Sequence, residues 1–191
     1  MTKSLRTLLA SAFTAALLAG NALADAPRVV LHTNKGPITI ELYPDKAPRS
    51  VANFLDYARS GFYEGTVFHR VVPRFMVQGG GYTTELMPKQ THDPIPNEAG
   101  NGLFNAPWSV AMARTDDPDS ATSEFFINLR LNTELDRSPE KGKAGYAVFG
   151  AVVDGQYVVN DISLGATLPT GDGENSLPKE PVVIERVEIL P

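Results

Sequence analysis

Residues 66–81, with the sequence TVFHRVVPRFMVQGGG, are the stretch that most constrains how this chain can fold. Residues 66–72 are rich in β-branched and aromatic side chains, which favour a strand, and Pro73 and Arg74 form a turn signal. Residues 75–78 can then run back along the first strand until three consecutive glycines end the pairing. The stretch therefore predicts a β-hairpin, and with it an antiparallel sheet.

On such a hairpin, Arg70 and Gln78 approach each other across the two strands and share one face. Phe75 and Met76 add an apolar patch beside them. A guanidinium and an amide next to an apolar patch suit an uncharged ligand that combines an amide with an apolar ring. Each residue also has a simpler explanation: Arg70 as a solvated surface charge, Phe75 and Met76 as core residues, and the glycines as a bulge and a loose turn.

The first 24 residues have the three-part pattern of a secretory signal peptide. Lys3 and Arg6 supply a positive start, and residues 8–20 are apolar and small. An Ala-Leu-Ala cleavage motif ends at residue 24, and the apolar run is short for a membrane span. We expect cleavage and export, which leaves residues 25–191 as one domain large enough for a sizeable core. The alternatives are an uncleaved anchor or a buried N-terminal helix.

Charge and composition argue against several classes of function. Removing the signal peptide takes away two basic residues and no acidic one, so the formal net charge changes from −5 to −7. Such a balance is unsuited to nucleic acid, which needs a basic surface for its phosphates. The chain has no cysteine, and His32, His69 and His92 match no metal-ligand spacing. We expect no disulfide, no metal and no nucleic-acid partner.

Hydrophobic periodicity predicts a mainly β chain. Residues 28–33 and 38–43 are β-branched runs on either side of a turn, and the second alternates apolar and polar residues as a half-exposed strand does. Further strands are predicted at residues 108–114, 125–129, 146–153 and 182–190. With the central hairpin the tally is about eight strands, which suggests a closed or nearly closed antiparallel barrel.

Two helices and several loops complete the expected structure. Residues 47–60 carry apolar residues at helical spacing, with Pro48 in the first turn and Gly61 at the end, and residues 155–163 form a shorter helix. An acidic connection at residues 115–122 resembles a calcium loop but lacks its glycine and distal glutamate, so we predict a solvated turn. Irregular loops are predicted at residues 83–102, 130–145 and 164–180.

Four blocks of sequence, in order, carry a resemblance to a known family. They are FHRVVPRFMVQGG at residues 68–80, SVAMAR at residues 109–114, SEFFIN at residues 123–128 and YAVFG at residues 146–150. Together they resemble the cyclophilin-type peptidyl-prolyl cis-trans isomerases, and the similarity extends over essentially all of residues 25–191. The resemblance implies a closed eight-stranded antiparallel barrel capped by two α-helices, with substrate bound on the outer face. The exported, cysteine-free form is most similar to periplasmic cyclophilins of Gram-negative bacteria, so we expect a periplasmic location, with secretion as the alternative.

The reaction that the resemblance implies is rotation about an Xaa-Pro peptide bond. The rotation barrier, roughly 18–20 kcal/mol, exists because twisting destroys the resonance of the amide. In the twisted state the proline nitrogen regains a lone pair, which an arginine N–H can meet. Such a hydrogen bond exists mainly in the transition state, which is the requirement for a higher rate. The reaction needs no nucleophile, metal or cofactor.

The resemblance assigns roles to nine residues. Arg70 is the catalytic residue, and Gln78 hydrogen-bonds the substrate backbone and helps to hold Arg70. Ala113 and Arg114 lie on the strand that pairs its main chain with the peptide. The remaining residues contribute to the substrate pocket that grips the proline ring: Phe75, Met76, Phe126, Leu135 and Tyr146.

Three residues depart from the pattern of cyclosporin-sensitive members. Glu134 stands in place of a tryptophan and Tyr146 in place of a pocket histidine, so we expect weak cyclosporin sensitivity. Glu124 replaces the usual glutamine beside the pocket, and Arg70 and Arg114 are its two candidate partners, between which the sequence does not decide. His69 precedes Arg70 and is expected to point to the opposite face of a strand as a structural residue.

The expected partners are proline-containing unfolded or partly folded polypeptides, bound by a monomer that contacts no membrane after signal cleavage. One alternative is a non-catalytic chaperone or peptide-binding module with the same barrel, against which the retention of Arg70, Phe75, Met76, Gln78 and Phe126 argues. Another is a hydrolase, but neither the G-x-S-x-G nor the H-E-x-x-H motif is present.

Overall fold

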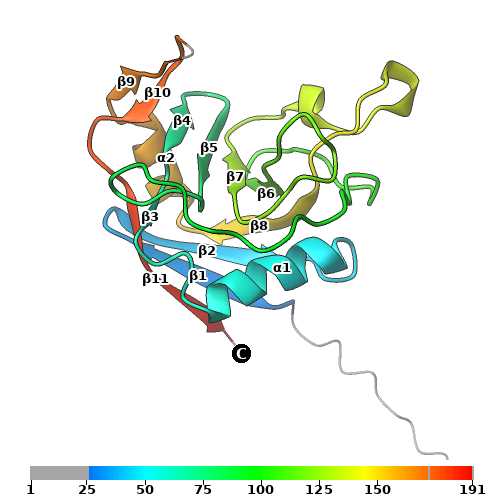
Figure 1. Cartoon of the computed structure of the whole chain (residues 1–191), viewed down its shortest axis with the longest axis horizontal. Coiled ribbons are helices and arrows are strands. Elements are labelled where there is room, and N and C mark those ends of the chain that lie inside the picture. Colours follow the sequence, from blue (N-terminus) through cyan, green and yellow to red (C-terminus); the bar gives the residue numbers. More distant parts are fainter. Residues whose placement is uncertain (1–25, 172, 191) are drawn as a thin grey trace, which may run out of the picture.

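The computed structural model describes residues 26–171 and 173–190. Within these residues a nine-stranded sheet, a separate two-stranded sheet and two α-helices make a mainly β domain (Figure 1). The expected signal peptide lies outside the described residues. The strands are β1 (Arg28–Thr33), β2 (Gly36–Leu42), β3 (Thr66–Val67), β4 (Arg70–Val72), β5 (Met76–Gly79), β6 (Ser109–Met112), β7 (Phe125–Asn128), β8 (Val148–Asp154), β9 (Thr167–Pro169), β10 (Asn175–Pro178) and β11 (Val183–Leu190).

The large sheet is curled but open, so the predicted closed eight-stranded barrel is wrong. Its strand order is β3-β11-β1-β2-β8-β6-β7-β5-β4. The predicted strand over residues 66–72 is split at Phe68 and His69 into β3, which pairs with β11, and β4, which pairs with β5. The two end strands therefore follow each other along one segment of chain, and among the described residues no ladder joins them.

The hairpin of β1 and β2 is confirmed, and it shows why alternating residues make this sheet. Val29 and Leu31 on β1 are fully buried, as are three apolar residues of β2, whereas the residues between them are more exposed. The two strands pair in register from Arg28 opposite Glu41 to Thr33 opposite Gly36. Side chains alternate between faces along a strand, so one face of the hairpin is apolar and forms part of the core.

Both predicted helices are present within a residue of their expected bounds. Helix α1 (Pro48–Arg59) buries Val51, Phe54, Leu55 and Ala58 against the sheet. Helix α2 (Gln156–Leu164) packs against β2 on another side of the domain. Two 3-10 helices, η1 (Thr133–Leu135) and η2 (Pro139–Lys141), lie in the predicted loop over residues 130–145. No helix among the described residues is long and apolar enough to cross a membrane.

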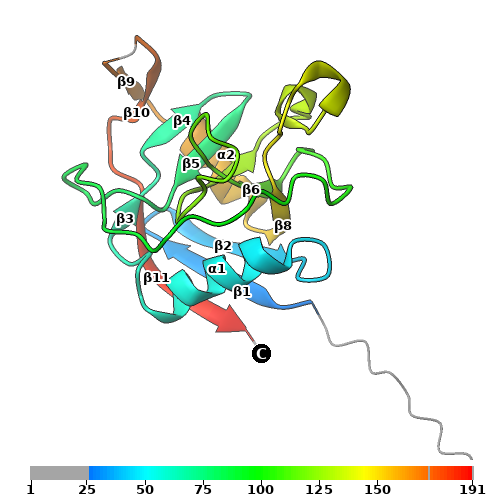
Figure 2. The ribbon, with the colours of Figure 1, turned by 45° about the vertical axis from the view of Figure 1, so that its right-hand side comes forward.

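The segment over residues 164–180 was predicted to be irregular, but β9 and β10 form a small hairpin within it. Its proline and glycine content hid the pairing, which is short and supported by a side-chain bond from Thr167 Oγ1 to the carbonyl of Asn175. Figures 1 and 2 both show this hairpin beside β4, an end strand of the large sheet. The hairpin therefore lies next to the strand that contains Arg70.

The start of helix α1 is capped from a distant loop. The carboxylate of Glu98 accepts hydrogen bonds from the backbone N–H groups of Arg49 at 3.0 Å and Ser50 at 2.8 Å, and from the Ser50 hydroxyl at 2.7 Å. A carboxylate at this end also complements the helix dipole. The cap ties the loop over residues 83–102 to the helix.

We predict that Glu98→Ala lowers the free energy of unfolding by about 1–2 kcal/mol, because it removes the acceptor for the first N–H groups of α1. Urea denaturation measures the loss. The control is Glu85→Ala, which removes an exposed carboxylate of the same loop and is expected to change stability by less than about 0.5 kcal/mol. Equal stability of the two variants would contradict the capping role.

Candidate active site

A pocket of about 220 Å³ lies on the face of β5, β6 and β7 that points away from the main core. Its walls are Arg70, Phe75, Met76, Gln78, Ala113, Arg114, Phe126, Leu135 and Tyr146. The structure therefore brings together all nine residues that the sequence singled out. Hollows of about 290 and 360 Å³ lie elsewhere on the described surface, but none of these nine residues lines either of them.

Strand alternation explains how one set of strands builds both the core and the pocket. On β7, Phe125 and Ile127 belong to the main core cluster, whereas Phe126 between them belongs to a second cluster on the other face. On β5, Val77 faces the core and Met76 faces the pocket. Period-two geometry therefore commits every second residue to the site.

The floor of the pocket is apolar and well packed. Met76 and Phe126 are only 2% and 4% exposed, and the ring of Tyr146 meets that of Phe126 edge to face at 5.6 Å between centroids. Phe75 and Leu135 are partly exposed and pack against the same cluster. The floor therefore offers an apolar surface to a small ring, while Arg70, Gln78 and Arg114 make the polar part of the walls.

A chain of buried asparagines supports the rim of the pocket, and the sequence did not indicate it. Asn132 donates to the carbonyl of Phe75 at 3.0 Å and to Asn128 Oδ1 at 2.7 Å. Asn128 donates in turn to Asn105 Oδ1 at 3.1 Å. These bonds hold the turn of Phe75 against the loop that leads into η1, where Leu135 lies. Asn128 is part of the SEFFIN block, but nothing in that block points to partners in two other loops.

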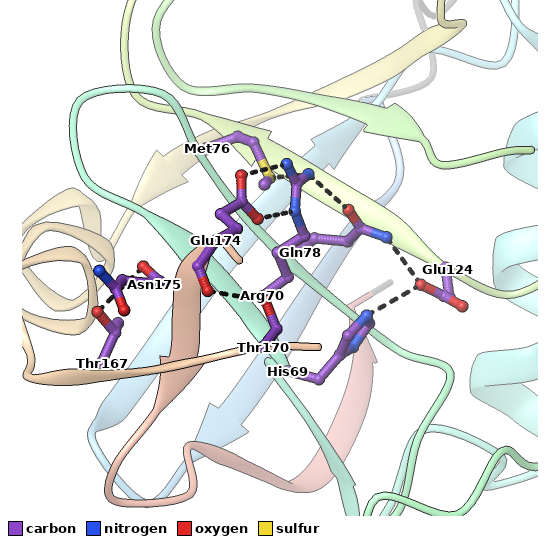
Figure 3. Close-up of polar contacts among 9 residues, drawn as sticks. All are labelled: His69, Arg70, Met76, Gln78, Glu124, Thr167, Thr170, Glu174 and Asn175. Atoms are coloured by element: carbon purple, nitrogen blue, oxygen red, sulfur yellow. Dashed lines mark hydrogen bonds and ion pairs between the residues drawn. The ribbon is translucent and has the colours of Figure 1, made fainter. Parts of the chain in front are cut away.

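Arg70 and Gln78 are directly opposite each other on β4 and β5, as the hairpin predicted. The Arg70 Nη1 atom lies 3.4 Å from Gln78 Oε1 and 3.9 Å from the sulfur of Met76 (Figure 3). The other side of the guanidinium is held by Glu174, which accepts from Nε at 2.7 Å and from Nη2 at 2.9 Å. Glu174 lies on the connection between β9 and β10, a segment predicted as irregular, and no local signal relates it to Arg70.

Arg70 and Arg114 were the two partners predicted for Glu124. Among the residues that the structure describes, Glu124 forms an ion pair with neither of them. Gln78 Nε2 donates to Glu124 Oε2 at 2.8 Å, and His69 Nε2 lies 3.3 Å from the same oxygen (Figure 3). Burial raises the pKa of the Glu124 carboxyl, but the hydrogen bond and charge of His69 and the hydrogen bond of Gln78 outweigh it. The pKa of Glu124 therefore lies below its ordinary value of 4.5.

His69 does not line the pocket of Arg70. Its ring lies 4.5 Å from that of Tyr82 and faces a separate hollow beside the β9–β10 hairpin. The strand alternation behind the sequence prediction does not apply here, because His69 stands in the break between β3 and β4. Its contact with Glu124 instead connects it to Gln78, and through Gln78 to Arg70.

The consecutive glycines after Gln78 make room for close contacts rather than forming a loose turn. Gly79 still belongs to β5 and pairs with Phe125. Gly80 has a φ of 88°, which favours glycine, and a Cβ at Gly81 would come within 2.5 Å of the Glu124 side chain. The glycines allow Glu124 to lie directly against the main chain beside Gln78.

The predicted strand over residues 108–114 ends at Met112, so Ala113 and Arg114 lie just beyond β6. The Ala113 N–H donates to the carbonyl of Glu124 at 2.9 Å. The guanidinium of Arg114 lies over the ring of Tyr146 at 4.3 Å and donates to the carbonyl of Gly145 at 3.0 Å. Arg114 thus closes one side of the pocket through its side chain.

A comparison with known protein families matches a part of the chain that includes every residue of this pocket. The family model described as cyclophilin type peptidyl-prolyl cis-trans isomerase/CLD matches residues 28–189. The chain belongs to this family. This cyclophilin is therefore an enzyme of the peptidyl-prolyl cis-trans isomerase class, and the resemblance drawn from its four sequence blocks is confirmed.

Curated bacterial relatives are similar over nearly their whole length. Peptidyl-prolyl cis-trans isomerase B of Escherichia coli is 50% identical over 162 residues, which cover 84% of this chain and 98% of the relative. Peptidyl-prolyl cis-trans isomerase of Acinetobacter baylyi is 50% identical over 173 residues, or 91% of this chain and 90% of the relative. A third, named cyp18, from Streptomyces antibioticus, is 50% identical over 163 residues, or 85% and 98%.

Solved structures share the fold of this cyclophilin. A cyclophilin type peptidyl-prolyl cis-trans isomerase from Cryptosporidium parvum matches with a TM-score of 0.69 at 23% identity, covering 86% of this chain and 98% of that chain. The same protein was also solved in the presence of the dipeptide Ala-Pro. A cyclophilin from Hirschia baltica matches with the same score and identity over 86% of this chain and 73% of that chain.

Glu134, which departs from cyclosporin-sensitive cyclophilins, lies outside the pocket wall. It forms an exposed ion pair at 2.5 Å with Arg130, four residues earlier in the chain. Arg130 in turn lies 5.8 Å from the ring of Phe75. The charge of Glu134 is therefore placed beside the entrance rather than within the apolar hollow.

We predict a pH-dependent contribution of Glu124 to stability, tested with Glu124→Gln. Because its pKa is lowered on folding, the carboxylate adds stability that is fully present above about pH 4.5 and is lost as the pH falls through the folded pKa. The wild-type protein should exceed the variant in free energy of unfolding at about pH 6 by more than at about pH 3. Urea denaturation at both pH values measures the difference.

The control for this prediction is Glu180→Gln, which removes an exposed carboxylate paired with Lys35. Solvent screens that pair, so the variant should differ little from the wild type at either pH. A stability difference for Glu124→Gln that stays constant across the pH range would contradict the prediction.

Proposed function

We propose that this cyclophilin accelerates rotation about Xaa-Pro bonds in unfolded or partly folded polypeptides, with Arg70 as the catalytic residue. One observation carries the proposal: the guanidinium of Arg70 stands on the wall of a pocket whose floor is Met76 and Phe126. A proline ring seated on that floor brings its nitrogen next to the guanidinium. Proline recognition and the proposed chemistry thus use the same small site.

The proposed chemistry is stabilisation of the twisted amide by a hydrogen bond. The planar amide nitrogen is a poor acceptor, whereas the nitrogen of the twisted state carries a lone pair. A donor fixed beside it therefore binds the transition state better than either ground state, which raises the rate rather than only the affinity. The apolar wall formed by Phe75, Leu135 and Tyr146 strengthens the bond by limiting competition from water.

The neighbours of Arg70 have supporting roles in this proposal. Gln78 accepts from Arg70 through its oxygen and is itself held by Glu124, so its amide group is fixed beside the pocket, where it can bond a substrate backbone. The main chain of Ala113 and Arg114 follows β6 along another wall of the pocket and is proposed to pair with the peptide. These contacts align the substrate around the proline ring.

We predict that Arg70→Ala lowers kcat/KM for an Ala-Pro peptide by about tenfold to a hundredfold, the loss expected for a hydrogen bond from a charged donor. Arg70→Lys should recover little of the rate, because an ammonium group lacks the planar fork that Gln78 and Glu174 hold. Exchange NMR of the peptide measures the rate, and urea denaturation confirms that each variant is folded.

Arg59→Ala, which removes an exposed arginine on α1, is the matched control and should keep the wild-type rate. Full activity in folded Arg70→Ala would overturn the proposed mechanism. Peptide binding without turnover by the unmutated protein would instead favour a non-catalytic peptide-binding module.

We also propose that the protein acts on exported polypeptides in the periplasm, with secretion as the alternative. The support is the sequence of the first 24 residues, in which a basic start, an apolar run and an Ala-Leu-Ala motif follow one another. A folding catalyst suits this compartment because exported chains arrive unfolded and proline isomerisation is slow, at tens to hundreds of seconds.

We predict that the full chain, produced in a Gram-negative bacterium, is released by osmotic shock and begins at Asp25. N-terminal sequencing and the intact mass measure the cleavage site. Ala24→Arg should block cleavage, because the processing site requires a small residue there. Recovery of the protein with residues 1–24 attached, and none in the shock fluid, would contradict export.

A further inference from the structure

The contact between Arg70 and Glu174 has no part in the function proposed so far. It joins an end strand of the large sheet to the connection of a separate hairpin, 104 residues further along the chain. Both oxygens of the carboxylate are used, one on Nε and one on Nη2 (Figure 3). Bidentate pairs of this kind fix the orientation of a guanidinium as well as contributing energy.

We infer that Glu174 is a positioning residue that holds Arg70 in its catalytic orientation. The inference rests on the proposed role of Arg70. Arginine has a long, flexible side chain, and Arg70 is 35% exposed on an end strand, so packing alone leaves it several rotamers. The proposed hydrogen bond goes to a single nitrogen atom, so it forms at a lower cost in entropy when the guanidinium is already fixed before the substrate binds.

The geometry favours positioning over obstruction. Glu174 takes the side edge of the guanidinium, at Nε and Nη2, whereas Nη1 faces Gln78 and Met76. The carboxylate thus leaves donor capacity at the Nη1 end of the fork, because a guanidinium has five N–H groups. Arg70 lines the pocket, but Glu174 is not among its lining residues. A proline ring in the pocket therefore does not compete with Glu174 for space.

Hydrogen bonds fix the hairpin that carries Glu174 both at Glu174 itself and at the base of the hairpin. The Thr170 N–H and hydroxyl both donate to the carbonyl of Glu174, at 2.7 and 2.8 Å. Across the base of the hairpin, the Lys179 N–H donates to the carbonyl of Ala166 at 2.8 Å, and β10 lies beside β4. The main chain of Glu174 is thereby fixed relative to Arg70.

Arg70 is consequently held from two sides. Glu174 fixes one edge, and Gln78, itself bonded to Glu124, contacts the other (Figure 3). The two supports differ in strength, because the bonds to Glu174 are short and charge-assisted, whereas the contact with Gln78 is 3.4 Å long. Loss of Glu174 should therefore release the guanidinium even when Gln78 is intact.

The test compares kcat and KM for an Ala-Pro peptide, measured by exchange NMR over a range of concentrations. We expect Glu174→Ala to lower kcat by about tenfold while KM changes by less than about twofold, because the pocket that binds proline is intact. Glu174→Gln keeps the shape of the side chain and one acceptor but loses the charge, so its kcat should lie between those of the wild type and Glu174→Ala. The control is Glu180→Ala, which removes a nearby exposed carboxylate and should keep the wild-type kcat.

A double-mutant cycle separates positioning from a general effect on structure. In an Arg70→Ala background, Glu174→Ala should lower the remaining rate by less than about twofold, because its effect passes through Arg70. An equal loss in both backgrounds, a kcat of Glu174→Ala matching that of Glu180→Ala, or a kcat above the wild type would each overturn the inference. Full activity of Arg70→Ala would overturn the proposed function instead, so the two failures are distinguishable.

Discussion

The alternation of side chains along β5, β6 and β7 is the constraint on which the rest of this structure depends. Each strand is only four residues long, yet it sends residues such as Phe125 and Ile127 into the core and Phe126 into the pocket. A shift in register by one residue would exchange these two sets and destroy both faces at once. The core and the pocket are therefore specified by the same few residues, so a change of register in these strands alters both.

The site could be predicted from the sequence to the extent that its residues lie in recognisable blocks. Arg70, Met76 and Gln78 are neighbours on a hairpin whose register follows from strand periodicity and a turn signal. Phe126 and Tyr146 were placed by the resemblance, since no local pattern says which distant strand comes alongside. The prediction of a closed barrel was wrong because the strand expected over residues 66–72 is broken at Phe68 and His69. A continuous run of β-favouring residues gives no sign of such a break.

What the sequence could not show were contacts between segments that have no periodic pattern. The hydrogen bonds among Asn105, Asn128 and Asn132 depend on two loops meeting the end of β7 in space, and asparagine in a loop is ordinarily a turn residue. Glu174 belongs to a stretch of glycines and prolines whose pairing is too short to predict. The same applies to Glu124, whose true partners, Gln78 and His69, differ from both arginines considered for it. Polar contacts of this kind are set by tertiary structure rather than by local preference.

The β9–β10 hairpin is a separate two-stranded sheet in which Ser176 is buried and the other described residues are half-buried or exposed. Surface segments of this type accept changes in length and sequence at small expense to the folded domain. Glu174, which holds the Nε edge of the Arg70 guanidinium, therefore lies on a peripheral segment of this type. Substitutions in this one peripheral turn can therefore change how the Arg70 side chain is oriented while the strands that form the core stay as they are.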